Sequence, residues 1–418
     1  MKNKKILIIM LSFLVFFAFP PVVTYDSSHY IGYIHILENP STLNTWDPVR
    51  GPVFPYFLFL IKKIFGFSPQ ILLAIQYLLY ISTFYLLLKL NKKIFKKEFL
   101  ILSIILFLIN PIFIGYFHAI LTEIIAIPLF LIITLFSLKL LEIKNIDKKN
   151  FIKYLLITIF LSTFSWQLKQ PYFVIILFQL LILIGIKIIK KEKILFLVIF
   201  LLTSLISVIL SNNIWNSIIK SNNNNPRSSN GILNNFTKNI SKEIEENGLF
   251  LFTKKTIKNY LALSNFYQIE FDKKSGPVVA TNIIILGQGN ENYTIGERFL
   301  SNNENIIGGL SVIPEKEYSG YLYQTNNTNY LVKDLLKKTF VIYNYLFSIC
   351  IISTPIIFIF CLFQKKYKLL LISGSSFLFF LMFAILSSAI DRYAIPGLLL
   401  SNITFIFQYF LIKNKNDK

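Results

Sequence analysis

The stretch FIKYLLITIFLSTFSWQLKQPYFVIILFQLLILIGIK, residues 151–187, is dominated by apolar side chains and carries a polar break around Lys169. As a helix, its 37 residues extend about 55 Å at about 1.5 Å per residue, close to the roughly 60 Å that two crossings of a bilayer need. The stretch therefore predicts two membrane spans joined by a tight turn. That turn cannot stand far above the membrane surface and can dip below it.

The whole chain predicts an all-α integral membrane protein with about ten transmembrane helices. Of its 418 residues, 54% are apolar and 15% are charged, whereas a soluble domain usually has about 25% charged residues. This composition excludes an ordinary soluble enzyme. The expected spans are residues 6–23, 69–90, 99–118, 123–141, 151–168, 171–187, 194–214, 339–363, 369–390 and 393–412.

The net charge of +21 is spread over short clusters between the apolar runs. Because the clusters do not gather on one face, the basic composition does not predict nucleic-acid binding. Cytoplasmic loops of membrane proteins are enriched in Lys and Arg, and most of the short basic clusters fall on one side if the first span starts inside. The sequence thus predicts a multi-pass protein of the cytoplasmic membrane with both termini in the cytoplasm.

Three parts are expected along the chain. Residues 1–214 form an N-terminal membrane module, and its first outer loop, residues 24–68, contains an amphipathic stretch that fits the membrane interface. Residues 215–338 form a small irregular cap on the outer face, with a helical candidate at 249–263 and a strand-like piece at 278–286. Residues 339–418 form the C-terminal membrane helices.

The sequence lacks the motifs of several enzyme classes. It has no glycine-rich phosphate loop, no His-Glu-x-x-His and no Asp-x-Asp, so nucleotide binding and zinc hydrolysis have no support. The three histidines show no metal-ligand spacing. The informative residues are therefore charges at the expected outer ends of spans, where a charge within the membrane usually faces a cavity or a polar partner.

Five such charges are candidate functional residues, although each also has an ordinary structural explanation. Glu123 follows Thr122, and an acid in a first helical turn is favoured by the helix dipole. Lys169 could extend to the lipid headgroups, and an arginine beside an acid can form a local ion pair. The five are Asp26, Arg50, Glu123, Lys169 and Arg392.

Aromatic and histidine residues accompany these charges. His29 lies three residues after Asp26, which permits a shared divalent cation but does not require one. Tyr25, Tyr30, Tyr33 and Trp46 are expected to form an aromatic belt at the membrane interface. His29, Tyr30 and Tyr393 are added as substrate-binding candidates, and whether a metal takes part is left open.

An ordered set of motifs resembles the bacterial protein-O-mannosyltransferase-like membrane glycosyltransferases of the GT-C class. The block Arg50-Gly-Pro-Val-Phe-Pro-Tyr56 is similar to the Arg-x-Pro-x-Tyr-Pro block of that family. Asp26 in the first outer loop, Asn110-Pro111 followed by Leu121-Thr-Glu123, and Arg392-Tyr-Ala-Ile-Pro396 agree in order. The resemblance covers residues 1–215 and 339–412.

The resemblance implies a transferase that takes a sugar from a polyprenyl-phosphate donor on the outer membrane face and inverts the anomeric centre. The acceptor would be a glycan, a lipid or a protein. Asp26 matches the family's first-loop acid, which acts as general base or orients the acceptor, and Glu123 matches the second outer acid. Arg50, Lys169 and Arg392 are the candidates for binding the departing phosphate, whose growing charge cations stabilise.

Three other functions compete with this interpretation. A lipid-linked sugar flippase would place ionisable residues near the middle of the membrane, whereas the charges here gather at span ends. A polysaccharide polymerase or ligase also has many spans and a long outer loop, but Asp26 and Glu123 fit it less well. A non-catalytic scaffold is the third alternative.

Overall fold

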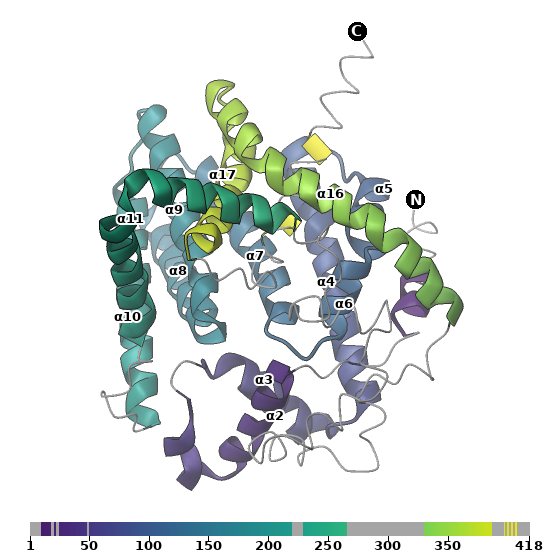
Figure 1. Ribbon diagram of the computed structural model, residues 1–418. Coiled ribbons are helices and arrows are strands. Elements are labelled where there is room, and N and C mark those ends of the chain that lie inside the picture. Colours follow the sequence, from purple (N-terminus) through teal and green to yellow (C-terminus); the bar gives the residue numbers. More distant parts are fainter. Residues whose placement is uncertain are drawn as a thin grey trace. The chain divides into compact units, whose positions relative to one another are not determined.

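Every secondary-structure element of the computed structural model is a helix over the residues that it describes (Figure 1). Those residues are 10–17, 21, 25–47, 50–219, 229–265, 330–386, 397, 399–400, 403 and 406–407. The elements are α2 (Tyr25–Glu38), the 3-10 helix η1 (Pro40–Thr45), α3 (Val53–Phe65), α4 (Pro69–Phe95), α5 (Leu100–Ser103), the π-helix η2 (Ile104–Leu108), α6 (Pro111–His118), α7 (Glu123–Glu142), α8 (Lys148–Leu168), α9 (Gln170–Ile189), α10 (Leu195–Ile218), α11 (Ser229–Asn265), α16 (Tyr330–Phe363) and α17 (Tyr367–Leu386).

Six helices in the described part are long and apolar enough to cross a membrane, and a bent pair raises the number to seven. The six are α4, α7, α8, α9, α10 and α17, all of which coincide with expected spans. The expected span at 339–363 falls on α16, where only the shorter helix Ser348–Phe363 is continuously apolar. The expected spans at 6–23 and 393–412 lie largely outside the described residues.

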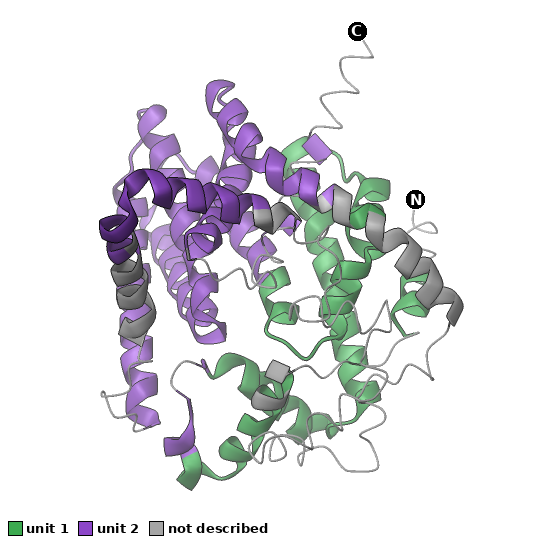
Figure 2. Cartoon of the chain, viewed as in Figure 1, with its two compact units in different colours: residues 1–42, 52–128, 270–345 green, residues 43–51, 129–269, 346–418 purple. Residues whose placement is uncertain are grey.

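The contacts divide the chain into two compact units (Figure 2). Unit 1 comprises residues 1–42, 52–128 and 270–345, and unit 2 comprises residues 43–51, 129–269 and 346–418. Both units are built from discontinuous pieces of the chain. The short segment 43–51 belongs to unit 2, although the residues on both sides of it belong to unit 1.

In unit 1, the segment that the sequence predicts as the first outer loop contains the helix pair α2 and α3. The ring of Tyr30 packs edge-on against Phe54 at 4.9 Å, and the Lys62 ammonium lies 2.9 Å from a Glu38 carboxylate oxygen. The amphipathic stretch expected at 55–67 is indeed helical. It buries Phe54, Leu58 and Ile61 and exposes Leu60 and Ile64, as a helix along an interface would.

A bend of 54° separates the two halves of the bent span in unit 1, Leu100–Leu108 and Pro111–His118. Asn110 explains where the second half begins: its side-chain oxygen accepts the Ile112 N–H at 3.0 Å, and Pro111 occupies the first helical turn. The break frees carbonyl groups of the first half. The Phe107 oxygen accepts the Asn110 N–H at 3.2 Å. The Tyr80 hydroxyl of α4 lies 2.7 Å from the Leu108 oxygen and 3.1 Å from the Phe107 oxygen, so α4 supplies a donor at the break.

His118 ends this span and is fully buried. Its Nδ1 lies 2.7 Å from the Ile114 oxygen, its Nε2 lies 2.8 Å from the Phe16 oxygen, and its ring lies 4.0 Å from the Phe16 ring. Its own carbonyl accepts a hydrogen bond from Gln76 at 3.0 Å. The contacts with Phe16 and α4 account for a buried histidine through packing and hydrogen bonding.

Replacing His118 by alanine should therefore destabilise unit 1 by about 2–4 kcal/mol, because the change removes a buried ring and its hydrogen bonds. Thermal unfolding in detergent measures the loss, and the half-exposed His35→Ala is the control. Equal melting temperatures for the two variants would contradict this role.

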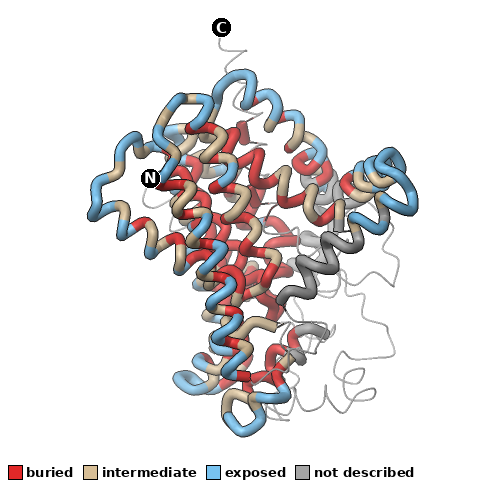
Figure 3. Tube along the Cα trace, turned by 90° about the vertical axis from the view of Figure 1, so that its left-hand side faces the viewer, coloured by how far each residue is buried: buried red, intermediate tan, exposed pale blue. Residues whose placement is uncertain are grey.

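In unit 2, α8, α9 and α10 pack side by side (Figure 1). The Ser162 hydroxyl bonds Ser204 at 3.0 Å between α8 and α10, and the Gln179 amide bonds Thr134 at 2.8 Å between α9 and α7. The apolar window of α10 is only 33% buried, whereas that of α17 is 67% buried. Figure 3 shows exposed residues running along the outlying helices and buried residues gathered between the helices. The exposed apolar face of α10 is suited to lipid.

The insertion between the last expected N-terminal span and α16 differs from the expected small irregular cap. Residues 229–265 form one long helix, α11, which kinks at Gly248 where φ is 76°. The helical candidate at 249–263 is confirmed. Asn259 donates to the Ala384 carbonyl at 2.9 Å and Tyr260 to the Ile351 carbonyl at 3.0 Å, so this half packs on α17 and α16. The strand-like piece expected at 278–286 lies outside the described residues.

Candidate functional site

The polar break between α8 and α9 is the centre of a cluster in unit 2 that we call the α8–α9 corner. It consists of the segment 43–51, residues 165–172 of α8 and α9, and residues 211–215 of α10. Lys169 has extended backbone angles, φ −167° and ψ 125°, which end α8 and start α9. The sequence predicted a turn at this position, and the structure confirms it.

Gly51 brings the segment 43–51 into backbone contact with α8. A Cβ atom on Gly51 would lie 1.9 Å from the carbonyl oxygen of Gln167 and 2.6 Å from its carbonyl carbon. Only glycine fits such a close backbone approach. Gly51 directly follows Arg50, and Gln167 lies two residues before Lys169, so the corner joins the chain segments that carry two of the expected phosphate-binding cations.

All three tryptophans of the chain lie in this corner. The Trp46 and Trp215 rings pack edge-to-face at 5.1 Å, and the Trp46 Nε1–H donates to the Arg50 carbonyl at 2.7 Å. Trp166 donates to the Asn212 side chain at 3.4 Å. These contacts fix the backbone of Arg50 against α10.

The α8–α9 corner also buries polar atoms that have no hydrogen-bond partner among the described residues. They are Ser165 Oγ, Gln170 Oε1 and Trp215 Nε1, in residues that are 0%, 8% and 8% exposed. Leaving a buried donor or acceptor unsatisfied costs about 1–3 kcal/mol. A hydroxyl can donate and accept a hydrogen bond, a carbonyl oxygen can accept one, and an indole N–H can donate one.

Lys169 is half-buried, and its ammonium lies 5.9 Å from the centre of the Tyr172 ring. Tyr172 is fully buried and packs edge-on against Phe130 at 5.7 Å. A lysine ammonium near the face of an aromatic ring is attracted to that ring. The contact therefore holds the Lys169 ammonium beside Tyr172.

The two candidate acids lie in unit 1, each in the first turn of a helix. Asp26 is the second residue of α2, and the structure describes its backbone alone. Glu123 is the first residue of α7 and is fully buried, with the Thr122 hydroxyl donating to its Oε2 at 3.2 Å.

The remaining candidates are only partly described. Arg392 and Tyr393 lie outside the described residues, and so does the side chain of His29. Tyr30 is 3% exposed and packs inside unit 1. The expected aromatic belt is therefore wrong for Tyr30, Tyr33 and Trp46, which are buried within the protein because helices α2, α3 and α10 cover them.

Among the residues whose side chains the structure describes, no group of three His, Cys, Asp or Glu side chains is placed to hold a metal ion. Asp26 and His29, the pair considered for a shared cation, are not among those side chains.

A comparison with protein families finds a match for part of the chain. Residues 49–215 match the model of the dolichyl-phosphate-mannose-protein mannosyltransferase family. This match confirms the resemblance that the sequence motifs indicated. The match covers less than half of the chain, and this matched part, here called the mannosyltransferase-family segment, includes Arg50, Glu123 and Lys169. No curated protein and no solved structure matches the chain significantly.

Sequence reasoning missed the polar residues that surround the two cations of the mannosyltransferase-family segment, namely Gln167, Gln170 and Trp215. A signal was present in the composition, because three tryptophans in 418 residues are few and two of them flank the ends of predicted spans. The contact of Gly51 with Gln167 joins positions more than a hundred residues apart. Such a contact produces no local sequence pattern from which it could have been predicted.

Proposed function

We propose that this protein is an inverting glycosyltransferase that moves a sugar from a polyprenyl-phosphate donor to an acceptor on the outer face of the cytoplasmic membrane. The family match supports a glycosyltransferase, and the name of the matched family makes a mannosyl donor the first to test. The acceptor is a glycan, a lipid or a protein. A donor of this kind is already activated as a phosphodiester, so the reaction needs no nucleotide.

The contact of Gly51 with Gln167 is the observation that carries the proposal. Gly51 follows Arg50, and Gln167 lies two residues before Lys169. The contact therefore supports a role for both cations in the α8–α9 corner. The leaving lipid phosphate gains negative charge as the glycosidic bond breaks, and cations preorganised around it lower the barrier. Arg50 would supply a forked contact to phosphate oxygens and Lys169 a point charge.

The buried polar atoms of the α8–α9 corner support a sugar ligand. A sugar hydroxyl donates one hydrogen bond and accepts others, and the corner presents an acceptor at Gln170 Oε1 and a donor at Trp215 Nε1. Binding would give these atoms the partners that the described residues do not provide, and would recover the cost of their burial.

Asp26 would take the proton from the acceptor hydroxyl as it attacks the anomeric carbon from the face opposite to the phosphate. Glu123 would orient the acceptor or a cation beside it. Attack from the opposite face inverts the anomeric centre, and the phosphate leaves as a monoester that remains attached to its lipid.

The proposal is tested by purified protein in lipid, incubated with radiolabelled polyprenyl-phosphate sugars and a membrane extract as acceptor. Arg50→Gln should lower kcat/KM by about 10²–10³-fold and Lys169→Gln by a smaller factor, because each loses a charge that acts in the transition state. Lys254→Gln, an exposed lysine of α11, is the matched control.

Two outcomes would count against the proposed function. One is transfer at the wild-type rate by the Arg50→Gln and Lys169→Gln double variant. The other is the absence of transfer from every monophosphate donor together with polymerisation or movement of diphosphate-linked glycans, which a polymerase or flippase would show.

A further inference from the structure

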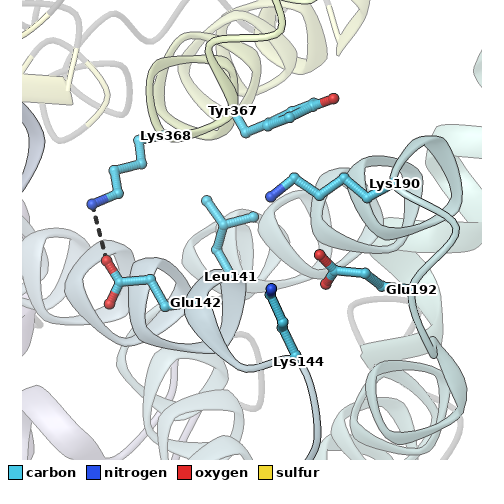
Figure 4. Close-up of a pocket in the computed structure, with 7 residues that line it drawn as sticks. All are labelled: Leu141, Glu142, Lys144, Lys190, Glu192, Tyr367 and Lys368. Atoms are coloured by element: carbon cyan, nitrogen blue, oxygen red, sulfur yellow. Dashed lines mark ion pairs between the residues drawn. The ribbon is translucent and has the colours of Figure 1, made fainter.

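A cavity of about 260 Å³ lies in unit 2 at one end of α7, α9 and α17, away from the α8–α9 corner (Figure 4). Glu142 belongs to the last turn of α7 and Lys144 to the loop that follows. Lys190 and Glu192 lie between α9 and α10, and Tyr367 and Lys368 start α17. Three lysines thus line a cavity that has two carboxylates.

Both carboxylates of this cavity already have a lysine partner. The Lys368 ammonium lies 2.9 Å from Glu142, and the buried Lys187, which does not line the cavity, binds Glu192. The hydrogen bond from Lys187 lowers the pKa of Glu192 below its ordinary value, and the nearby Lys190 and Lys144 lower it further. Glu192 therefore stays ionised near neutral pH. With Lys187 counted, four lysines at and beside the cavity oppose two carboxylates, so two positive charges are in excess, and Lys144 and Lys190 are the two lining lysines outside these ion pairs.

The two lysines in excess face the same space. Figure 4 shows the ammonium groups of Lys144 and Lys190 pointing toward the gap between the ends of α7 and α9. The Lys190 ammonium lies 4.4 Å from the centre of the Tyr367 ring, which holds it in place without neutralising it. Two ammonium groups at the mouth of one cavity are arranged for an anion.

The cavity lies where the membrane surface would meet the protein. It opens at the ends of helices that are long and apolar enough to cross a membrane, and positively charged residues near span ends attract anionic lipids. Ile188 and Ile189, directly before Lys190, are 58% and 50% exposed. An anion bound here would have apolar side chains beside it, which suits a lipid better than a free phosphate.

We propose that this cavity binds the phosphate headgroup of an anionic glycerophospholipid. Lys144 and Lys190 contact the phosphate oxygens, the ring of Tyr367 keeps Lys190 in position, and the acyl chains lie along Ile188 and Ile189. The positive charge of the loops predicts that this end faces the cytoplasm, so the lipid belongs to the inner leaflet. The site is separate from the proposed transfer site and does not depend on it.

Native mass spectrometry of the full chain in detergent tests the proposal, with phosphatidylglycerol, phosphatidylcholine and glycerol 3-phosphate as separate ligands. Wild type should retain phosphatidylglycerol in preference to the other two. Lys144→Gln with Lys190→Gln should weaken that binding about 10- to 30-fold, since each lysine near a membrane surface contributes roughly fivefold. Lys144→Gln alone, at an exposed loop position, should give an intermediate loss.

Lys148→Gln with Lys193→Gln is the matched control. Lys148 starts α8 and Lys193 lies between α9 and α10, and both are exposed lysines that do not line the cavity. Equal losses in this control and in the cavity variant would overturn the proposal, since the binding would then be general surface attraction. Glycerol 3-phosphate bound as tightly as phosphatidylglycerol would overturn it too, because the acyl chains would contribute nothing.

Discussion

Asp26→Asn is expected to abolish sugar transfer while the protein keeps its fold. Asparagine has nearly the same shape as aspartate but cannot accept the acceptor's proton, and a positioned general base contributes about 10²–10⁴ in rate. Asp26 lies in the first turn of α2, and the substitution keeps the size of the side chain, so the fold should tolerate it. The measurement is single-turnover transfer of label from a polyprenyl-phosphate sugar in lipid.

Glu245→Gln provides a matched loss of negative charge at an exposed position of α11. The control should transfer at the wild-type rate, and both variants should melt within about a degree of wild type. If the Asp26→Asn protein kept a tenth or more of the wild-type rate, Asp26 would not be the base, and Glu123 would be examined by the same substitution.

Gly51→Ala is expected to disrupt the α8–α9 corner. The new methyl group would meet the backbone of Gln167 at 1.9 Å, and a backbone atom cannot move aside as a side chain can. Overpacking of this kind costs about 1–3 kcal/mol, with the upper end expected because the clash involves main-chain atoms. Melting temperature and transfer activity should fall together, since the segment that carries Arg50 must move.

Gly185→Ala is the control for that substitution, because a Cβ there would meet nothing within 4 Å and Gly185 lies inside α9 of the same unit. It should raise stability slightly, by about 0.5–1 kcal/mol, since alanine favours helix more than glycine does. Tryptophan emission gives a local readout, as all three tryptophans lie in the corner. An unshifted spectrum and an unchanged melting temperature for Gly51→Ala would contradict the close approach.

Helix positions were largely predictable from the sequence because a membrane span needs a fixed length of apolar chain. Six expected spans coincide with α4, α7, α8, α9, α10 and α17. The bend at Asn110-Pro111 had a visible signal, a capping residue followed by proline, yet the apolar run continues through it and hydropathy alone predicts one straight span. The second half of α11 was expected as the helical candidate at 249–263, whereas the half before Gly248 was hidden by its polar composition.

The candidate site was predictable in part. Lys169 was identified because a charged residue is easily recognised at the end of an apolar span. Arg50 was identified by the sequence motif that it begins. The neighbours Gln170 and Trp215 were not predictable, since burial of a neutral polar atom depends on how helices pack. The close contact of Gly51 depends on tertiary structure as well, and any glycine before a proline looks the same in sequence.

The bent span in unit 1 also constrains the order in which the protein can be assembled. The break interrupts the regular backbone hydrogen bonds at the end of its first half, where the oxygens of Phe107 and Leu108 both lie within hydrogen-bonding distance of the Tyr80 hydroxyl. Translation delivers α4, which carries Tyr80, before this span leaves the ribosome. The Tyr80 hydroxyl is thus already in the bilayer when the Phe107 and Leu108 carbonyl groups enter it. The bent span can insert against the folded helix α4, where a hydrogen-bond donor is present, and not into lipid alone.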